Sequence, residues 1–279
     1  MSQPERHFLL ASDFDQTLSF DDSGGVLADL LGVRNFAEKV DGLERSNLVQ
    51  QGGELAYLIR HDPEFRQVRP EHLVEAGKRV TLKRNIPALL RLLRDGIAGN
   101  RFSFLVISAA PRLVVESALE GLVAPENIFA TEFDFDSRSG EVRAVRRVPA
   151  GYGKVTVIEE LQRNLGIPPD RVVYVGDGSS DVHVMLHVNN HDGFTIAVSE
   201  NRQLARIARS TVVSDNACSI LVPIFNQLFG LRAGEIRRHF EGLGLSLNDW
   251  EQERTDRVII ADLVSEGVIP VPDLEEQVS

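Results

Sequence analysis

The sequence predicts an α/β protein in which helices cover both faces of a parallel β-sheet. Short apolar runs of strand length alternate along the chain with amphipathic stretches of helical length, as they do in parallel sheets. Residues 20–83, in contrast, contain helical patterns and no clear strand. We therefore expect a small helical insertion directly after the first strand.

Each expected strand is a short apolar run that ends at a polar or turn-forming residue. The run 171–175 is apolar almost throughout, which is typical of a strand buried on both faces. Residues 134–142 are rich in Asp, Ser and Gly and predict a hairpin turn. The expected strands are 8–12, 102–108, 127–131, 171–175, 194–198 and 211–213.

Capping and breaking residues mark the expected helices. The Asp-Asp-Ser run at 21–23 can cap a helix that stops at Gly32. Pro111 fits the first turn of another helix, and Pro168 acts as a breaker after a third. The expected helices are 23–31, 36–49, 54–59, 71–78, 87–94, 111–119, 153–165 and 203–207.

Composition and charge exclude several classes of function. The 279 residues are 43% hydrophobic and 25% charged, as in ordinary globular proteins. A net charge of -11 works against non-specific binding to nucleic acid or anionic lipid. No apolar run approaches the roughly 18 residues of a membrane span, and a single cysteine, Cys218, excludes an internal disulfide. We expect a cytoplasmic protein with no nucleic-acid or membrane partner.

The last segment, residues 231–279, differs from the rest of the chain. It carries many charges and a helical pattern through Val258, Ile259, Leu263 and Val264. We expect a C-terminal helical extension that packs on the core or pairs two chains.

Reactive side chains recur at the ends of expected strands and at the starts of expected helices. They are Asp13, Asp15, Ser108, Lys154, Asp177 and Asp181. The carboxyl ends of parallel strands meet at one sheet edge, where open α/β sheets bind their ligands. Gathered carboxylates repel one another, and a hard divalent cation with oxygen ligands, most plausibly Mg²⁺, relieves that repulsion. Lys154 at a helix N-terminus opposes the helix dipole, so an anion is expected beside it.

Several candidate residues can be interpreted in more than one way. Asp177 and Asp181 fit the N-terminus of a helix, and Asp22 fits a helix cap. His183, His187 and His191 recur at the spacing of zinc-binding helices. We expect these histidines to be packed or solvated, because the Asn-rich run before Gly193 ends the helix early.

The segments 13–17 (Asp-Phe-Asp-Gln-Thr) and 176–181 (Gly-Asp-Gly-Ser-Ser-Asp), together with Ser108 and Lys154, resemble the four motifs of the haloacid dehalogenase superfamily of phosphohydrolases. The resemblance covers about residues 8–225, and the insertion is similar to the small cap of the phosphoserine-phosphatase-like branch. It implies a three-layer, Rossmann-like parallel sheet core. The expected organisation is a core of residues 1–19 and 84–230, a helical cap of residues 20–83, and the extension 231–279.

The resemblance also implies roles for the motif residues. Asp13 would be the nucleophile that becomes an aspartyl phosphate, and Asp15 would be the general acid and then the general base. The metal site would be formed by Asp13, Asp177 and the main-chain carbonyl of Asp15, with Asp181 orienting the waters of Mg²⁺. The phosphate would be bound by Thr17, Ser108 and Lys154.

The expected substrate is a small phosphorylated metabolite, with phosphoserine as one candidate. Asp22 falls where phosphoserine phosphatases carry the acid that meets the substrate ammonium group. The cap offers three arginines for the substrate carboxylate, Arg45, Arg60 and Arg66, and nothing in the sequence selects one of them. A phosphotransferase with the same intermediate and a non-catalytic binding or regulatory protein are the alternatives.

Overall fold

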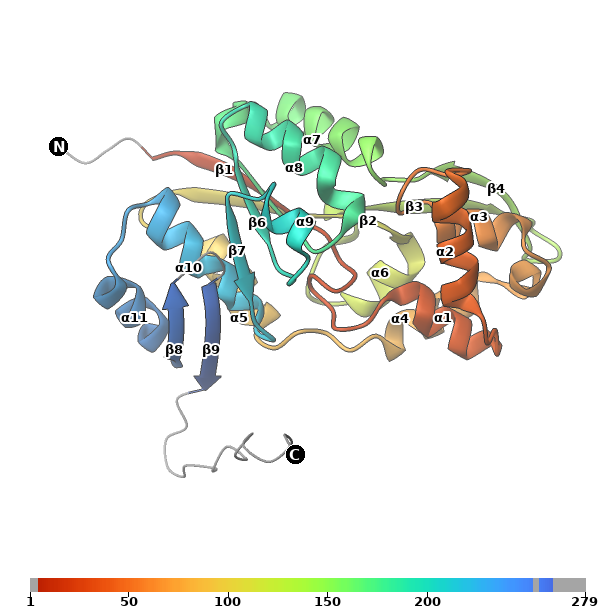
Figure 1. The fold of residues 1–279 in the computed structure, drawn as a ribbon, viewed down its shortest axis with the longest axis horizontal. Helices are drawn as coiled ribbons and strands as arrows, with labels where there is room; N and C mark the ends of the chain where they lie inside the picture. The colour runs from red at the N-terminus through yellow and green to blue at the C-terminus, as the bar shows by residue number, and fades with distance from the viewer. Residues whose placement is uncertain (1–4, 253–255, 263–279) are drawn as a thin grey trace.

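The computed structural model describes residues 5–252 and 256–262, and their strands form one nine-stranded sheet in the order β4-β3-β2-β1-β5-β6-β7-β9-β8 (Figure 1). Strands β3, β2, β1, β5, β6 and β7 are parallel, while β4 pairs antiparallel with β3 through the expected hairpin. The α/β fold class is thus confirmed. The strands are β1 (His7–Ser12), β2 (Arg101–Pro111), β3 (Ile128–Phe135), β4 (Val142–Arg147), β5 (Val172–Gly176), β6 (Phe194–Ala197), β7 (Ser210–Val213), β8 (Leu245–Gln252) and β9 (Asp256–Asp262).

Helices cover both faces of the sheet, as Figure 1 shows. Alternate side chains of β1 point to opposite faces, so Leu9 and Ala11 join the apolar cluster under α7 and α8, whereas Phe8 and Leu10 join the larger cluster that contains α5 and α6. The helices are α1 (Ser23–Leu31), α2 (Phe36–Ser46), α3 (Glu54–His61), α4 (Pro70–Arg79), α5 (Ile86–Asp95), α6 (Arg112–Ala118), α7 (Tyr152–Leu165), α8 (Val182–Asn190), α9 (Arg202–Ala205), α10 (Leu221–Pro223) and α11 (Ala233–Gly242).

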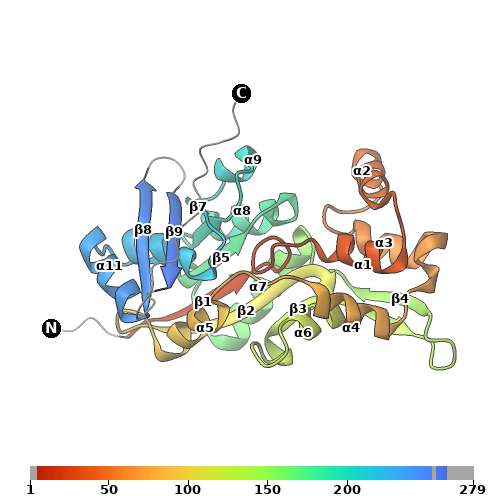
Figure 2. The ribbon, with the colours of Figure 1, turned by 90° about the horizontal axis from the view of Figure 1, so that it is seen from below.

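Helices α1 to α4 form the insertion that follows β1, and they lie at one end of the elongated molecule (Figure 2). Gly77 lets α4 approach α6 closely, because a Cβ atom there would lie 2.3 Å from the carbonyl oxygen of Val114. The insertion is thereby packed on the core at its last helix.

The C-terminal segment corrects the expected helical extension. In the described part of this segment, residues 231–252 and 256–262, only α11 is helical, and β8 and β9 instead extend the sheet, with β9 paired parallel to β7 and antiparallel to β8. Val258 and Ile260 are buried at the period of a strand, and Ile259 lies between them in β9. Val258, Ile259 and Ile260 are three consecutive β-branched residues, which favour a strand. The helical pattern that continues to Leu263 and Val264 concealed this preference. Leu263 and Val264 lie outside the described residues.

Strand β2 is longer than expected. The strand that was expected to end at Ser108 continues to Pro111, with an irregular register after Ile107. Among the helices that the structure describes, none combines the length and the apolar character needed to cross a membrane.

Candidate active site

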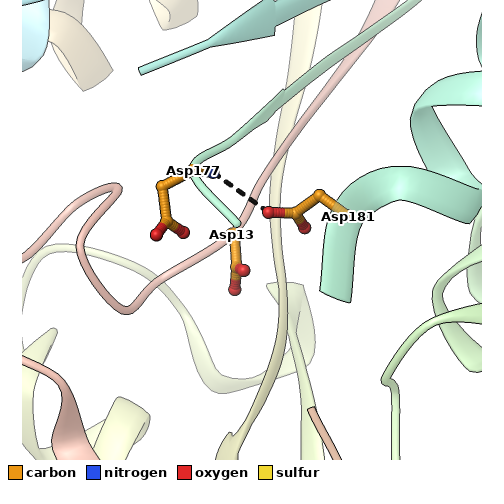
Figure 3. Close-up of side chains that lie close together, drawn as sticks. All are labelled: Asp13, Asp177 and Asp181. Carbon is orange, nitrogen blue, oxygen red and sulfur yellow. Dashed lines mark hydrogen bonds between the residues drawn. The ribbon is translucent and has the colours of Figure 1, made fainter. Parts of the chain in front are cut away.

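Three carboxylates that are far apart in the sequence meet at the carboxyl edge of the sheet. Asp13 directly follows β1 and Asp177 directly follows β5, which pairs with β1. Asp181 follows one short turn later, and ligand atoms of the three carboxylates lie within 4.8 Å of one another. Figure 3 shows the three side chains together, with the Asp177 backbone joined to Asp181. The predicted convergence is therefore present in the fold.

Lys154 is completely buried behind these carboxylates. It lies in the first turn of α7, and its Nζ atom donates to Asp13 Oδ2 and to Asp181 Oδ1, each at 2.6 Å. The anion that the sequence required beside this lysine is thus supplied by the protein itself. Ion pairs that are buried with good hydrogen-bond geometry hold their members in one arrangement.

Asp181 organises the loop that carries Asp177. Its Oδ2 atom accepts from the backbone N–H groups of Asp177 and Gly178 at 3.0 and 3.1 Å, and its Oδ1 atom accepts from Tyr174 Oη at 2.6 Å in addition to Lys154. Tyr174 was missed in the sequence, where it read only as part of an apolar strand. The sequence did contain a signal: Tyr174 places a hydroxyl in an otherwise apolar strand, and a buried Tyr hydroxyl needs a hydrogen-bond partner.

Asp15 is held by the first helix of the insertion. Ser23 begins α1, and its backbone N–H and hydroxyl donate to the two oxygens of Asp15 at 3.0 and 2.8 Å. Burial and the neighbouring Asp22 raise the pKa of Asp15 well above its ordinary value. A raised pKa favours the protonated form of the carboxyl group, which is the form that can give a proton to a leaving group. Sequence reasoning assigned no partner to Asp15.

The remaining predicted residues also lie around this point. Thr17 donates from Oγ1 to Asp177 Oδ1 at 3.2 Å, and the buried Ser108 accepts from the N–H of Ala110 at 3.1 Å. Asp22 caps α1, accepting from the N–H of Gly25 at 2.8 Å, as its structural interpretation predicted. Asp22 and Ser108 both line the cavity described next.

A cavity of about 460 Å³ lies between the insertion and the carboxyl edge of the sheet. Its floor includes Asp13, Asp15 and Asp177, and its roof is formed by residues of α1, α2 and α3. Gly52, at φ +88°, lies in the loop before α3 and approaches the core so closely that a Cβ atom there would lie 2.8 Å from the Ser180 Cβ. The insertion therefore lies over a partly open space that is large enough for a small molecule.

The donor set fits a hard divalent cation. Burial and the nearby Asp13 carboxylate raise the pKa of Asp177 to about 8, and burial raises that of Asp13 to about 6 despite Lys154. Burial is the largest cause of both shifts, and among the described residues the three carboxylates of the site face only one lysine within the cluster. Carboxylate oxygens are the ligands that Mg²⁺ and Ca²⁺ prefer, so a bound cation would stabilise the ionised forms.

These raised pKa values predict how stability depends on pH. A carboxyl group with a raised pKa binds more protons in the folded than in the unfolded state, so its contribution is lost as pH rises through the folded-state pKa. We expect the melting temperature of the metal-free protein to fall between about pH 5 and pH 8, and added Mg²⁺ to reverse the fall. Scanning calorimetry with the Asp177→Asn variant as control checks this, and a midpoint that rises with pH in the metal-free protein contradicts it.

The other candidate ligands do not join this centre. The rings of His187 and His191 contact each other in a tilted arrangement with centroids 4.5 Å apart, and His183 contacts Tyr152 in a similar way. Within residues 5–252 and 256–262, the only cluster of metal-ligating side chains found is that of Asp13, Asp177 and Asp181. The expectation of packed or solvated histidines agrees with these contacts.

None of the three cap arginines lines the active-site cavity as the structure describes it. Arg60 and Arg66 line a separate cavity between α3 and the β3–β4 hairpin. Arg45 pairs with Asp41 at 3.6 Å, with 82% of its side chain exposed. The site therefore lacks the arginine that a substrate carboxylate was expected to meet.

Comparison with known proteins gives relatives over most of the chain. The rat (Rattus norvegicus) protein named pyridoxal phosphate phosphatase PHOSPHO2 is 27% identical over 239 residues, which cover 76% of this chain and 95% of that protein. The solved structure of a phospho-aspartyl intermediate analogue of phosphoserine phosphatase matches with a TM-score of 0.64 at 20% identity, covering 78% of this chain and 99% of that chain.

A substrate-bound phosphoserine phosphatase matches with a TM-score of 0.63 at 20% identity, over 78% of this chain and 98% of that chain. Likenesses at this identity establish a shared fold. The family model described as haloacid dehalogenase-like hydrolase matches residues 10–186, which is more than half of the 279 residues and includes every candidate core residue of the site. The chain therefore belongs to the haloacid dehalogenase-like hydrolase family.

Proposed function

We propose that this protein is an Mg²⁺-dependent phosphatase that hydrolyses a small phosphorylated metabolite through an aspartyl-phosphate intermediate on Asp13. One observation carries the proposal: Asp13 lies at the floor of the cavity under the insertion, between the buried Lys154 and the carboxylate of Asp177. Mg²⁺, held by Asp13, Asp177 and the main-chain carbonyl of Asp15, would supply positive charge for the phosphoryl oxygens.

The reaction takes place in two phosphoryl-transfer steps, first to Asp13 and then to water. A carboxylate oxygen of Asp13 attacks phosphorus, the bond between phosphorus and the ester oxygen breaks, and Asp15 donates its proton to the leaving alcohol. Water then attacks the phosphorus of the aspartyl phosphate while Asp15 accepts a proton from it, which releases phosphate and regenerates Asp13. The raised pKa of Asp15 and its anchoring on Ser23 support the acid role.

The other residues bind and enclose the substrate. Thr17, Ser108 and Lys154 bind or neutralise the phosphoryl group. Asp181 positions the loop of Asp177 and would orient the waters of a bound cation. Residues 20–83 act as a cap over the core of residues 1–19 and 84–230. Residues 231–279 are a separate extension, whose described part lies at the far end of the sheet from the cap. The contact of Gly52 with the core supports the cap role.

The names of the similar proteins suggest two candidate substrates. The rat relative is named a pyridoxal phosphate phosphatase, and the solved structures are titled as phosphoserine phosphatases. The volume of the cavity, about 460 Å³, is compatible with either small ester.

The proposal predicts phosphate release that requires a divalent cation. We expect the purified protein to hydrolyse p-nitrophenyl phosphate in the presence of Mg²⁺, to lose activity on chelation with EDTA, and to recover it when excess Mg²⁺ is added. Assays with Ca²⁺ and Mn²⁺ at matched concentration test the choice of ion. A folded protein that releases no phosphate from any of a panel of phosphorylated metabolites would contradict the proposal and favour a binding role.

A further inference from the structure

Glu54 is a buried carboxylate whose hydrogen bonding is incomplete. It is the first residue of α3, it lines the active-site cavity, and it is only 5% exposed. Its Oε1 atom has no hydrogen-bond partner within the part of the chain that the structure describes. Leaving a buried polar atom without a partner is costly, and the cavity is where a partner can bind.

The wall of the cavity on the cap side is acidic. Asp22, Asp41, Glu44 and Glu54 all line it, and among the described residues no lysine, arginine or histidine does. The buried Lys154 serves the carboxylates of the core, and the exposed Arg45 reaches only Asp41. A ligand in the cavity therefore meets an excess of acidic over basic side chains on the side away from the phosphoryl site.

The surroundings of Glu54 strengthen its preference for a cation. Burial raises the pKa of Glu54, the backbone N–H groups of Glu54 and Gly52 partly oppose this, and the nearby Glu44 raises it further. Phe36, Val40 and Leu55 add apolar walls to the same cavity, and apolar surroundings strengthen electrostatic interactions. A bound cation relieves the repulsion between Glu44 and Glu54, whereas a bound carboxylate adds to it.

We propose that the leaving group of the substrate carries a positively charged hydrogen-bond donor, such as an ammonium group, and no carboxylate, and that Glu54 binds this donor. The inference rests on the proposed phosphatase function and narrows its substrate class. Phosphoserine carries the ammonium group but also a carboxylate, for which the cavity wall offers no basic partner. An aminoalkyl phosphate fits the cavity better.

Three esters of matched length test the charge preference. In 2-aminoethyl phosphate the donor is a cation, in 2-hydroxyethyl phosphate it is neutral, and phosphoserine adds a carboxylate to the first. A hydrogen bond to a charged group is worth about 1.5–3 kcal/mol, or roughly 10- to 100-fold in kcat/KM. We expect 2-aminoethyl phosphate to exceed each of the other two by about that factor.

Two variants test whether Glu54 causes the preference for a cationic leaving group. We expect Glu54→Gln to lower kcat/KM for 2-aminoethyl phosphate by about 10-fold or more and to change that for 2-hydroxyethyl phosphate less than about threefold. The matched control is Glu38→Gln, which removes the same charge from an exposed position of α2 outside the cavity. The control should leave both values and their ratio unchanged.

Calorimetric binding separates failure of this inference from failure of the phosphatase proposal. The Asp13→Asn variant with Mg²⁺ is titrated with 2-aminoethyl and 2-hydroxyethyl phosphate, so the affinity ratio is obtained without turnover. A ratio near one, or an equal loss for both esters in Glu54→Gln, overturns the cation site even where hydrolysis is observed. A ratio of about 10 or more supports it even where hydrolysis fails and the phosphatase proposal falls.

Discussion

Replacing Asp13 by Asn should abolish phosphatase activity while leaving the protein folded. The amide keeps the shape of the side chain and an acceptor for the N–H of Phe14, which donates to Asp13 at 2.7 Å. It cannot form the acyl phosphate, so the two-step route is closed. We expect kcat to fall on the order of 10⁴-fold or more, as it does when a nucleophile that works with other catalytic groups is removed. Steady-state hydrolysis of p-nitrophenyl phosphate with Mg²⁺ measures the effect.

The control for this variant is Asp29→Asn, which makes the same change at an exposed position of α1. It should retain nearly full activity. Because both proteins are purified in the same way, the residual activity of Asp13→Asn sets an upper limit on any contaminating phosphatase. Hydroxylamine, which traps acyl phosphates, should label the wild-type protein during turnover and leave Asp13→Asn unlabelled. If Asp13→Asn kept more than about one hundredth of wild-type activity, Asp13 would not be the nucleophile.

Replacing Lys154 by Met should cause the largest loss of stability. The side chain of Lys154 is 0% exposed, and its ammonium group is within 2.6 Å of both Asp13 and Asp181. Methionine fills similar volume but leaves two buried carboxylates without their cation. Breaking a buried ion pair on one side costs about 3–5 kcal/mol in the free energy of unfolding. Chemical denaturation at neutral pH without added metal measures this loss.

A surface lysine in the same kind of pairing provides the comparison. Lys39 also contacts two carboxylates, those of Asp62 and Glu64 at 2.6 and 2.7 Å, but its side chain remains 19% exposed. Lys39→Met should therefore cost less than about 1 kcal/mol. Equal losses for the two variants would show that Lys154 is not held in a dry, tightly coupled cluster.

Much of the site could be predicted from the chain alone. Asp13 and Asp177 follow apolar runs that read as parallel strands, and the ends of parallel strands meet at one edge whatever the intervening loops do. Lys154 was placed at the start of its helix by its position in the pattern, and the fold puts it there. The hairpin before β4 was predicted from its turn residues.

The C-terminal strands could not be predicted with the same method. The apolar residues around Val258 satisfy a helical spacing and a strand spacing over a short window. What decides between them is the pairing of β9 with its neighbours β7 and β8. The partner residue in β7, Val212, lies more than 40 positions earlier in the chain. Local pattern contains no information about such pairing.

The sequence by itself determined the α/β class, the helical insertion after the first strand and the set of acids and lysine at the sheet edge. These features depend on the period of apolar residues and on turn chemistry, which are local. Only the tertiary structure decided that Tyr174 supports Asp181, that Ser23 holds Asp15, and that one carboxylate oxygen of Glu54 finds no hydrogen-bond partner among the described residues in an acidic cavity. Those contacts join side chains from separate elements, and their geometry exists only when the helices of the insertion pack over the sheet.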